Sequence, residues 1–229
     1  MNNMKNILIT GANRGIGLMF AKSFSNNVDT VYTTVRDLNN CDELKKIKNI
    51  EILELDLVDK NSIKSFCSEI KDIPLDLILN NAGTFQDEQM EETNLDSDLW
   101  LDEIMINAIG PMTLTQKLKE NLMSGIEKKV VFISSQMGSV DDNYSGGYYF
   151  YRTSKSALNS AAKSLAIDWK ADNISVLMLH PGWVKTDMGG SKAKLEIEES
   201  VSSMLKVINA FDILKTGSFV NYDGKKLEW

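Results

Sequence analysis

Histidine is almost absent from this chain, because His180 is the single one among 229 residues. A hydrolytic triad built on histidine would have to use it, and a histidine–cysteine metal site would have almost nothing else to recruit. His180 ends an apolar run and is followed at once by Pro181, so we expect it to close a strand. The sequence therefore predicts no metal site and gives little support to histidine-based catalysis.

Cysteine is scarce too, and long hydrophobic runs are missing. Cys41 and Cys67 are too few for a disulfide framework, which fits a reducing compartment. No apolar stretch approaches a membrane span, and residues 1–5 lack the apolar region of a signal peptide. The formal charge of -7 argues against nucleic acid or an anionic membrane as the main partner. We expect a cytoplasmic protein with no nucleic-acid and no membrane partner.

What the chain does contain is an alternation of short apolar runs with helical patterns. The runs predict strands at residues 6–10, 30–35, 50–55, 75–80, 129–135, 174–179 and 217–222. Between them lie helical patterns, including a long one over 95–123 that we expect Gly110-Pro111 to interrupt. Strands alternating with helices of about a dozen residues imply right-handed crossovers and a parallel sheet. No Pro-, Gly- or Ser-rich linker divides the chain, so we predict a single α/β domain over 1–229.

A glycine-rich turn, Gly11-Ala12-Asn13-Arg14-Gly15-Ile16-Gly17, joins the first strand to a helical pattern. A strand, such a turn and a helix bring backbone N–H groups and a positive helix end against phosphates. Gly11 would permit the tight turn, Gly15 close approach of the backbone to a ligand, and Gly17 close packing of helix on strand. The alternative is an ordinary strand–helix turn, but three glycines in seven residues favour a phosphate site.

The end of the second strand bears on which dinucleotide would bind. An NAD site places an acid there for the ribose 2′-OH, whereas Val35 is followed here by Arg36. A guanidinium suits the 2′-phosphate of NADP, and Arg14 is a second cation on the same side. Asp37 complicates this interpretation because it could itself bond a ribose. Arg36 and Asp37 could also be ordinary loop charges.

The stretch Tyr151-Arg152-Thr153-Ser154-Lys155 opens the helical pattern that runs to about residue 169. Residues four apart share a helix face, so Lys155 should lie beside the phenol of Tyr151 and favour the phenolate. A tyrosine so placed could exchange a proton with an oxygen that is becoming an alkoxide. Chance also supplies such pairs, and Tyr148 with Arg152 makes a second one. Ser135 ends the fifth strand, where serine is usually loop punctuation, but near Tyr151 it would be a second donor.

Taken together, these residues resemble the short-chain dehydrogenase/reductase family over essentially the whole chain. The matching pieces, in the family's order, are Thr10-Gly11-x-x-x-Gly15-x-Gly17, Asp56, Asn80-Asn81-Ala82-Gly83, Asn107, Ser135, Tyr151-x-x-x-Lys155, and Pro181-Gly182 with Thr186. Residues 10–17 and 180–190 look more particularly like the C-factor-like and carbonyl-reductase-like branch. The resemblance implies a Rossmann-type doubly wound sheet of about seven mainly parallel strands, with helices on both faces.

The resemblance also implies a role for each matching residue. Tyr151 would be the general acid, and Lys155 would lower its pKa and bind the nicotinamide ribose. Ser135 would bond the substrate oxygen, and Asn107 would hold a water that links Lys155 to solvent. The residues expected to bind the cofactor are Gly11, Asn13, Arg14, Gly15, Ile16, Gly17, Arg36, Asp56, Leu57, Asn81, Ala82, Gly83, Tyr151, Lys155, Pro181, Gly182, Val184 and Thr186.

These expectations combine into an NADP-preferring oxidoreductase that acts on a small carbonyl or alcohol, with NAD(H) still possible. The alternative is a signalling or scaffold protein that keeps the fold and cofactor binding without metabolic turnover. A homodimer through the helices near 95–121 and 151–170 is the family-like expectation. Candidate walls of the substrate pocket are Phe85, Gln136, Met137, Tyr144, Tyr148, Trp183 and Met188.

Overall fold

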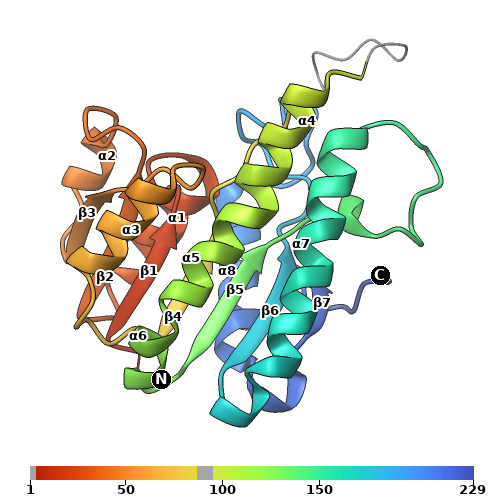
Figure 1. The fold of residues 1–229 in the computed structure, drawn as a ribbon. Coiled ribbons are helices and arrows are strands. Elements are labelled where there is room, and N and C mark those ends of the chain that lie inside the picture. The colour runs from red at the N-terminus through yellow and green to blue at the C-terminus, as the bar shows by residue number, and fades with distance from the viewer. Residues whose placement is uncertain (1–3, 87–94) are drawn as a thin grey trace.

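A seven-stranded parallel sheet forms the centre of the molecule, with strand order β3-β2-β1-β4-β5-β6-β7 (Figure 1). The computed structural model describes residues 4–86 and 95–229. The strands are β1 (Asn6–Thr10), β2 (Thr30–Val35), β3 (Ile50–Glu54), β4 (Leu77–Asn80), β5 (Lys129–Ile133), β6 (Ser175–His180) and β7 (Ser218–Asn221). The predicted doubly wound fold is confirmed, and His180 closes β6 as expected.

Helices cover both faces of this sheet. One face carries α1 (Gly15–Phe24), α2 (Asp42–Lys45) and α8 (Ile197–Ala210). The other, nearer the viewer in Figure 1, carries α3 (Lys60–Glu69), α4 (Ser97–Ile104), α5 (Gly110–Lys117), α6 (Lys119–Ser124) and α7 (Tyr149–Asp168). Within the described residues, no helix has the length and hydropathy needed to cross a membrane.

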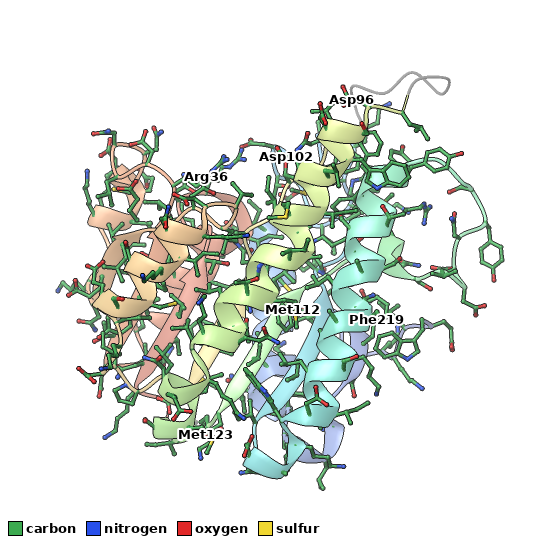
Figure 2. The ribbon with its side chains drawn as sticks, viewed as in Figure 1. Arg36, Asp96, Asp102, Met112, Met123 and Phe219 are labelled. Carbon is green, nitrogen blue, oxygen red and sulfur yellow. The ribbon has the colours of Figure 1, made fainter. Side chains whose placement is uncertain are left out.

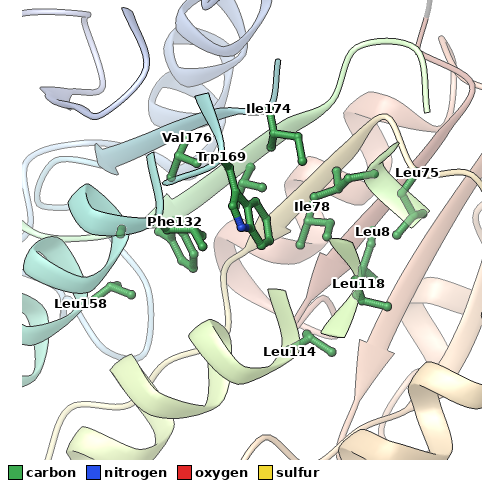
Figure 3. Close-up of a cluster of buried hydrophobic side chains, with 14 of the residues drawn as sticks. Leu8, Leu75, Ile78, Leu114, Leu118, Phe132, Leu158, Trp169, Ile174 and Val176 are labelled. Carbon is green, nitrogen blue, oxygen red and sulfur yellow. The ribbon is translucent and has the colours of Figure 1, made fainter. Parts of the chain in front are cut away.

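Strict alternation along the central strands divides the apolar side chains between two cores. On β5, Val130 and Phe132 join the core under α3, α5 and α7, while Val131 and Ile133 join the core under α1 and α8. Figure 3 shows the first core, where Phe132 lies among side chains from several elements. Both faces of each central strand are buried, which is why these strands are continuous hydrophobic runs in the sequence.

The helix over 95–123 was predicted to break at Gly110-Pro111, but it does not break there. Instead α4 continues into α5 through one π-helical turn, Met105–Ile109, in which the Gly110 N–H donates to the Met105 carbonyl. Pro111 lies in the first turn of α5, where a missing N–H costs little. The actual division comes later, at Leu118, between α5 and α6. In place of the predicted interruption there is a local widening of the helix.

At the amino edge of the sheet, one buried carboxylate joins two chain segments. Asp76 precedes β4 and accepts hydrogen bonds from the backbone N–H groups of Lys5 and Asn6, at 2.6 and 3.1 Å. It also accepts from Ile126 and Glu127, at 2.6 and 3.3 Å. Four donors on a buried carboxylate compensate its loss of hydration. Asp76 therefore attaches the starts of β1 and β5 to the centre of the sheet.

Candidate active site

A cavity of about 1190 Å³ opens at the carboxyl edge of the sheet. Its walls come from the glycine-rich turn, the ends of β2, β3 and β4, the first turns of α7, and the segment 181–191. In Figure 2, Arg36 and Asp102 lie at this end of the molecule, opposite Met123. Open parallel sheets bind ligands at this edge, because the strands there diverge into separate loops.

The glycine-rich turn has the backbone geometry that the sequence predicts. Gly11 and Gly15 adopt φ values of 64° and 54°, which favour glycine. A Cβ on Gly17 would stand 2.4 Å from the Gly11 carbonyl, so only glycine lets α1 pack this closely. A Cβ on Gly15 would instead project toward the Thr186 methyl at 3.6 Å, inside the cavity that both residues line. The backbone of the turn is thus open to a ligand at Gly15.

Asn81 holds this turn in position from the neighbouring strand. Its side-chain amide donates to the carbonyls of Thr10 and Gly11, both at 3.0 Å. The Thr10 hydroxyl accepts in return from the N–H groups of Asn81 and Ala82, at 3.0 and 3.1 Å. The segment after β4 and the turn after β1 therefore form one hydrogen-bonded unit under the cavity.

At the end of β2, Arg36 and Asp37 behave differently. Both are exposed and line the cavity, but the Asp37 carboxylate is engaged by its own loop. It accepts from the N–H and side-chain amide of Asn39, each at 2.8 Å, and from the side-chain amide of Asn40 at 2.9 Å. The Asp37 carboxylate therefore stabilises the loop, which leaves the Arg36 guanidinium as the group presented toward a ligand.

Tyr151, Ser135 and Lys155 converge at the floor of the cavity. Tyr151 lies in the first turn of α7, and its hydroxyl is hydrogen-bonded to the side chain of Ser135. The Lys155 ammonium lies 5.6 Å from the centre of the Tyr151 ring and donates to the Ile133 carbonyl at 3.0 Å. The predicted helix face thus brings Tyr151 and Lys155 together, and the end of β5 supplies Ser135.

The expected low pKa of Tyr151 is not found in this protein, because its pKa is raised. Burial raises the pKa of Tyr151 to about 12, because it outweighs the opposing hydrogen bond to Ser135. Burial also lowers the pKa of Lys155 to about 8, against the opposing effect of the Glu103 carboxylate. At neutral pH the phenol therefore carries its proton and the lysine is mainly an ammonium.

Asn107, in the π-helical turn, is 1% exposed and joins three parts of the site. Its side chain accepts from the Thr84 N–H at 2.8 Å and donates to the Thr84 carbonyl at 2.9 Å, as a neighbouring strand would. It also donates to the Ser154 hydroxyl at 3.0 Å. Asn107 Oδ1 and Lys155 Nζ both lie within 4 Å of where a Cβ on Gly83 would stand. Asn107 is thus placed beside Lys155.

The segment after β6 is held by hydrogen bonds. Lys185 N–H donates to the Leu195 carbonyl, and Leu195 N–H donates to Trp183, at 2.9 and 3.0 Å. The Thr186 hydroxyl accepts from Gly189 N–H at 3.1 Å.

Asp187 on this segment forms a 2.6 Å salt bridge with Arg14 at the mouth of the cavity. Both side chains are mostly exposed, Asp187 at 78% and Arg14 at 68%. Such a surface pair contributes little energy, so Arg14 can exchange Asp187 for another anion at small cost.

Aromatic side chains pack against Tyr151 beside the cavity. The Phe85 and Tyr151 rings are nearly perpendicular, with their centroids 5.1 Å apart. The centroids of the Phe85 and Tyr148 rings are 5.8 Å apart. Met188 lines the cavity. Tyr144, however, is 89% exposed, so its expected place in the pocket wall is not supported.

Most residues predicted to bind a cofactor line the cavity, and two do not. The lining includes Gly11, Asn13, Arg14, Gly15, Ile16, Gly17, Arg36, Asp56, Leu57, Asn81, Ala82, Gly83, Tyr151, Lys155, Pro181 and Thr186. Gly182 lies against Leu195, and Val184 is buried. The predicted catalytic residues Asn107 and Ser135 lie just behind the cavity wall. No group of three metal-ligating side chains occurs in the part of the chain that the structure describes.

Sequence reasoning missed several lining residues and one buried acid. Thr84, Ile106 and Ser134 line the cavity. Each is next in sequence to a predicted site residue, and this adjacency is what could have revealed it. Glu103 is fully buried four residues before Asn107. Its signal was the helical spacing, which puts it on the face of the helix that carries Asn107.

A comparison with protein families agrees with this geometry. The model for short chain dehydrogenase matches residues 5–196. That span contains the glycine-rich turn, the Tyr151–Lys155 pair and the segment with Thr186. The chain therefore belongs to the short-chain dehydrogenase family and is an oxidoreductase by its fold and family.

Individual relatives point in the same direction. C-signal of Myxococcus xanthus is 35% identical over 178 residues, which cover 73% of this chain and 100% of that protein. The carbonyl reductase Sniffer of D. melanogaster is 36% identical with a TM-score of 0.91, covering 99% of this chain and 100% of its own. An NADPH-bound carbonyl reductase from chicken fatty liver is 32% identical with a TM-score of 0.92, with all of both chains covered.

Proposed function

We propose that this protein is an NADP(H)-preferring carbonyl reductase or alcohol dehydrogenase in which Tyr151 is the general acid and base. The observation that carries the proposal is the convergence at the cavity floor. There a half-buried, protonated phenol is bonded to Ser135 and lies beside the ammonium of Lys155. The similarity to two carbonyl reductases over nearly the whole chain supports the same reaction.

The residues of the cavity fit a dinucleotide. The cavity extends from Arg36, past the glycine-rich turn, to Tyr151 and Thr186. The N-terminus of α1 points its free N–H groups at the region beside Gly15, where phosphates are favoured. Asp56 and Leu57 line the part that would hold the adenosine, while Lys155 and Thr186 line the part that would hold the nicotinamide end. When bound, the dinucleotide supplies or accepts the hydride.

The chain's own residues would supply orientation and a proton. In reduction, Tyr151 gives the phenol proton to the substrate oxygen as negative charge develops there. Ser135 donates to the same oxygen, and the Lys155 ammonium stabilises the phenolate that Tyr151 becomes. Asn107 holds the Thr84 segment and the start of α7 in register, which keeps Lys155 in place. Because its pKa is raised to about 12, Tyr151 keeps its proton at neutral pH, which is the form that reduction needs.

Substitution of Tyr151 tests this assignment. Tyr151→Phe keeps the ring packed against Phe85 but removes the transferable proton, so turnover should fall roughly 10²–10⁴-fold. NADPH affinity should stay close to the wild-type value. The measurement is NADPH oxidation with a panel of small ketones and aldehydes, together with NADPH titration of both proteins. Tyr149→Phe, on the exposed side of the same turn, is the matched control. Wild-type turnover in Tyr151→Phe would refute the assignment.

The preference for NADP rests on the contrast between Arg36 and Asp37. Asp37 is occupied by Asn39 and Asn40, while Arg36 is exposed on the cavity rim. Arg36→Ala should therefore weaken NADPH binding roughly 10–100-fold, since a hydrogen bond to a charged group contributes about 1.5–3 kcal/mol. NADH binding should change less than about twofold. Lys64→Ala, which removes an exposed cation from α3, is the control, and equal losses for both cofactors in Arg36→Ala would contradict the preference.

The signalling or scaffold alternative remains a second candidate because of the similarity to C-signal. It predicts NADPH binding without turnover of any carbonyl in a broad panel. The catalytic set Ser135, Tyr151, Lys155 and Asn107 is complete, which favours chemistry. Turnover that depends on Tyr151 would therefore decide for the enzyme.

We further propose a cytoplasmic homodimer in which residues 1–229 act as one domain. One sheet joins all seven strands, which supports a single domain. Leu101 and Ile109 of the α4–α5 helix and Ile167 of α7 are 62%, 46% and 66% exposed, and burying them would favour association. Light scattering on the purified chain tests the dimer, which Leu101→Lys should weaken.

A further inference from the structure

A buried acid lies directly behind the proposed catalytic residues. Glu103, in the last turn of α4, is 0% exposed. One carboxylate oxygen accepts from the Gln86 N–H at 3.1 Å, and the other accepts from the Asn107 amide at 3.3 Å. Asn107 in turn bonds Thr84 and Ser154. Glu103 is therefore part of a chain of contacts that joins α4, the segment after β4 and the start of α7.

Burying this acid needs a reason, because an ionised carboxylate out of water costs several kcal/mol unless it is paired. Among the described residues, its charge acts on two titratable side chains of α7, Tyr151 and Lys155. The segment 84–86, packed on the carboxylate, brings no ionisable side chain, and the other acids of α4, Asp98 and Asp102, are exposed. The Lys155 ammonium is thus a cation on which this negative charge acts.

We propose that Glu103 is a positioning residue whose carboxylate holds Asn107 in register and provides the buried negative charge that accompanies the Lys155 ammonium. The inference rests on the proposed function, because it assigns Lys155 its role as the cation beneath the phenol. Burial opposes the charged form of Lys155, and Glu103 opposes that effect of burial. The acid therefore allows Lys155 to be both enclosed and protonated near neutral pH.

The sharpest test removes the charge and keeps the shape. Glu103→Gln retains one carbonyl oxygen for hydrogen bonding, so the protein should still fold. Its NADPH affinity should stay within about twofold of the wild-type value. Loss of the negative charge lowers the pKa of both Lys155 and Tyr151. Because reduction needs both groups protonated, the alkaline limb of the kcat profile should move to lower pH by about one unit. Glu120→Gln, the same change at an exposed site, should leave the limb in place.

A second readout does not depend on turnover. An NMR titration of the lysine ε-carbons, with the Lys155 resonance assigned by its loss in Lys155→Arg, reports the Lys155 pKa directly. That pKa is about 8 in the wild type and should fall by about one unit in Glu103→Gln. Glu103→Asp keeps the charge at a shorter reach, so it should restore the wild-type midpoint even where Asn107 is held less firmly.

The outcomes separate the two proposals. If the wild type reduces no carbonyl, the proposed function fails, and the NMR titration alone decides the role of Glu103. An unchanged Lys155 midpoint in Glu103→Gln, with kcat lowered or the protein destabilised, would show a purely structural residue and overturn the inference. A midpoint that moves in Glu103→Gln and returns in Glu103→Asp supports it.

Discussion

The two edges of the central sheet handle buried ionisable groups in opposite ways. At the amino edge, the buried Asp76 side chain accepts four hydrogen bonds from backbone N–H groups. At the carboxyl edge, burial acts against the charged forms of Tyr151, Lys155 and His180. The amino edge fixes its acid with backbone hydrogen bonds, whereas the carboxyl edge keeps groups whose pKa values are shifted. Perturbed groups gathered beside a cavity are typical of a functional site.

The amino edge should lose the most free energy of unfolding when its acid is removed. Asp76→Ala leaves four backbone N–H groups of Lys5, Asn6, Ile126 and Glu127 without their acceptor. The expected loss is roughly 3–5 kcal/mol, since each unsatisfied buried donor costs about 1–3 kcal/mol. Urea unfolding measures it, with the exposed neighbour Asp72→Ala as the control.

If the edges are independent, the folded fraction of Asp76→Ala should retain the wild-type KM for NADPH. A large rise in that KM would show that the amino edge also shapes the cavity, so the two edges would not be independent.

His180 should give the next largest effect, through acid pH. Its pKa is lowered from 6.5 to about 4 by burial, and Nδ1 lacks a hydrogen-bond partner within the described residues. The unfolded chain binds a proton between these two pH values and the folded chain does not, so stability falls as pH drops through that window. The loss that depends on His180 should reach roughly 3 kcal/mol near pH 4.

The measurement is urea unfolding at neutral pH and near pH 4, for the wild type and for His180→Gln. The difference between the two proteins isolates the imidazole from the other titrating groups. An equal loss of stability in both would contradict the assignment.

The smallest effect concerns Lys155 and turnover. Its pKa of about 8 lies far below that of Tyr151, at about 12, so Lys155 is the first of the pair to lose its proton as pH rises. Turnover in the reductive direction should be level below about pH 8 and fall about tenfold per unit above it. A kcat profile that stays level to about pH 10 would contradict this, because it would mean that the neutral amine serves equally well.

The sequence was a good guide where local chemistry repeats along the chain. Alternating runs predicted all seven strands to within two residues at each end, because buried parallel strands are continuous apolar segments. The glycine-rich turn and the pair Tyr151 and Lys155 were also found in advance, since both depend on short fixed spacings. Asn81 was predicted to bind a cofactor, and the structure shows in addition that its amide holds the turn.

What the sequence could not provide was the balance between burial and nearby charge. Four-residue spacing predicted that Lys155 would lower the pKa of Tyr151, but burial has the larger effect and raises it. The occupied carboxylate of Asp37 and the salt bridge between Arg14 and Asp187 depend on loop paths that no spacing rule gives. Glu103 resembled any other helical acid until its burial was known.

The π-helical turn at Met105–Ile109 has a consequence for how this site tolerates change in length. The turn holds one residue more than an α-helix would use, and Asn107 lies within it. Deleting a single residue there would return the turn to α-helical geometry, so the change would fall on the turn itself while α4 and α5 kept their relation. Asn107 would then leave its place against Thr84 and Ser154. In this part of the chain, we expect natural selection to act more strongly against insertions and deletions than against many substitutions.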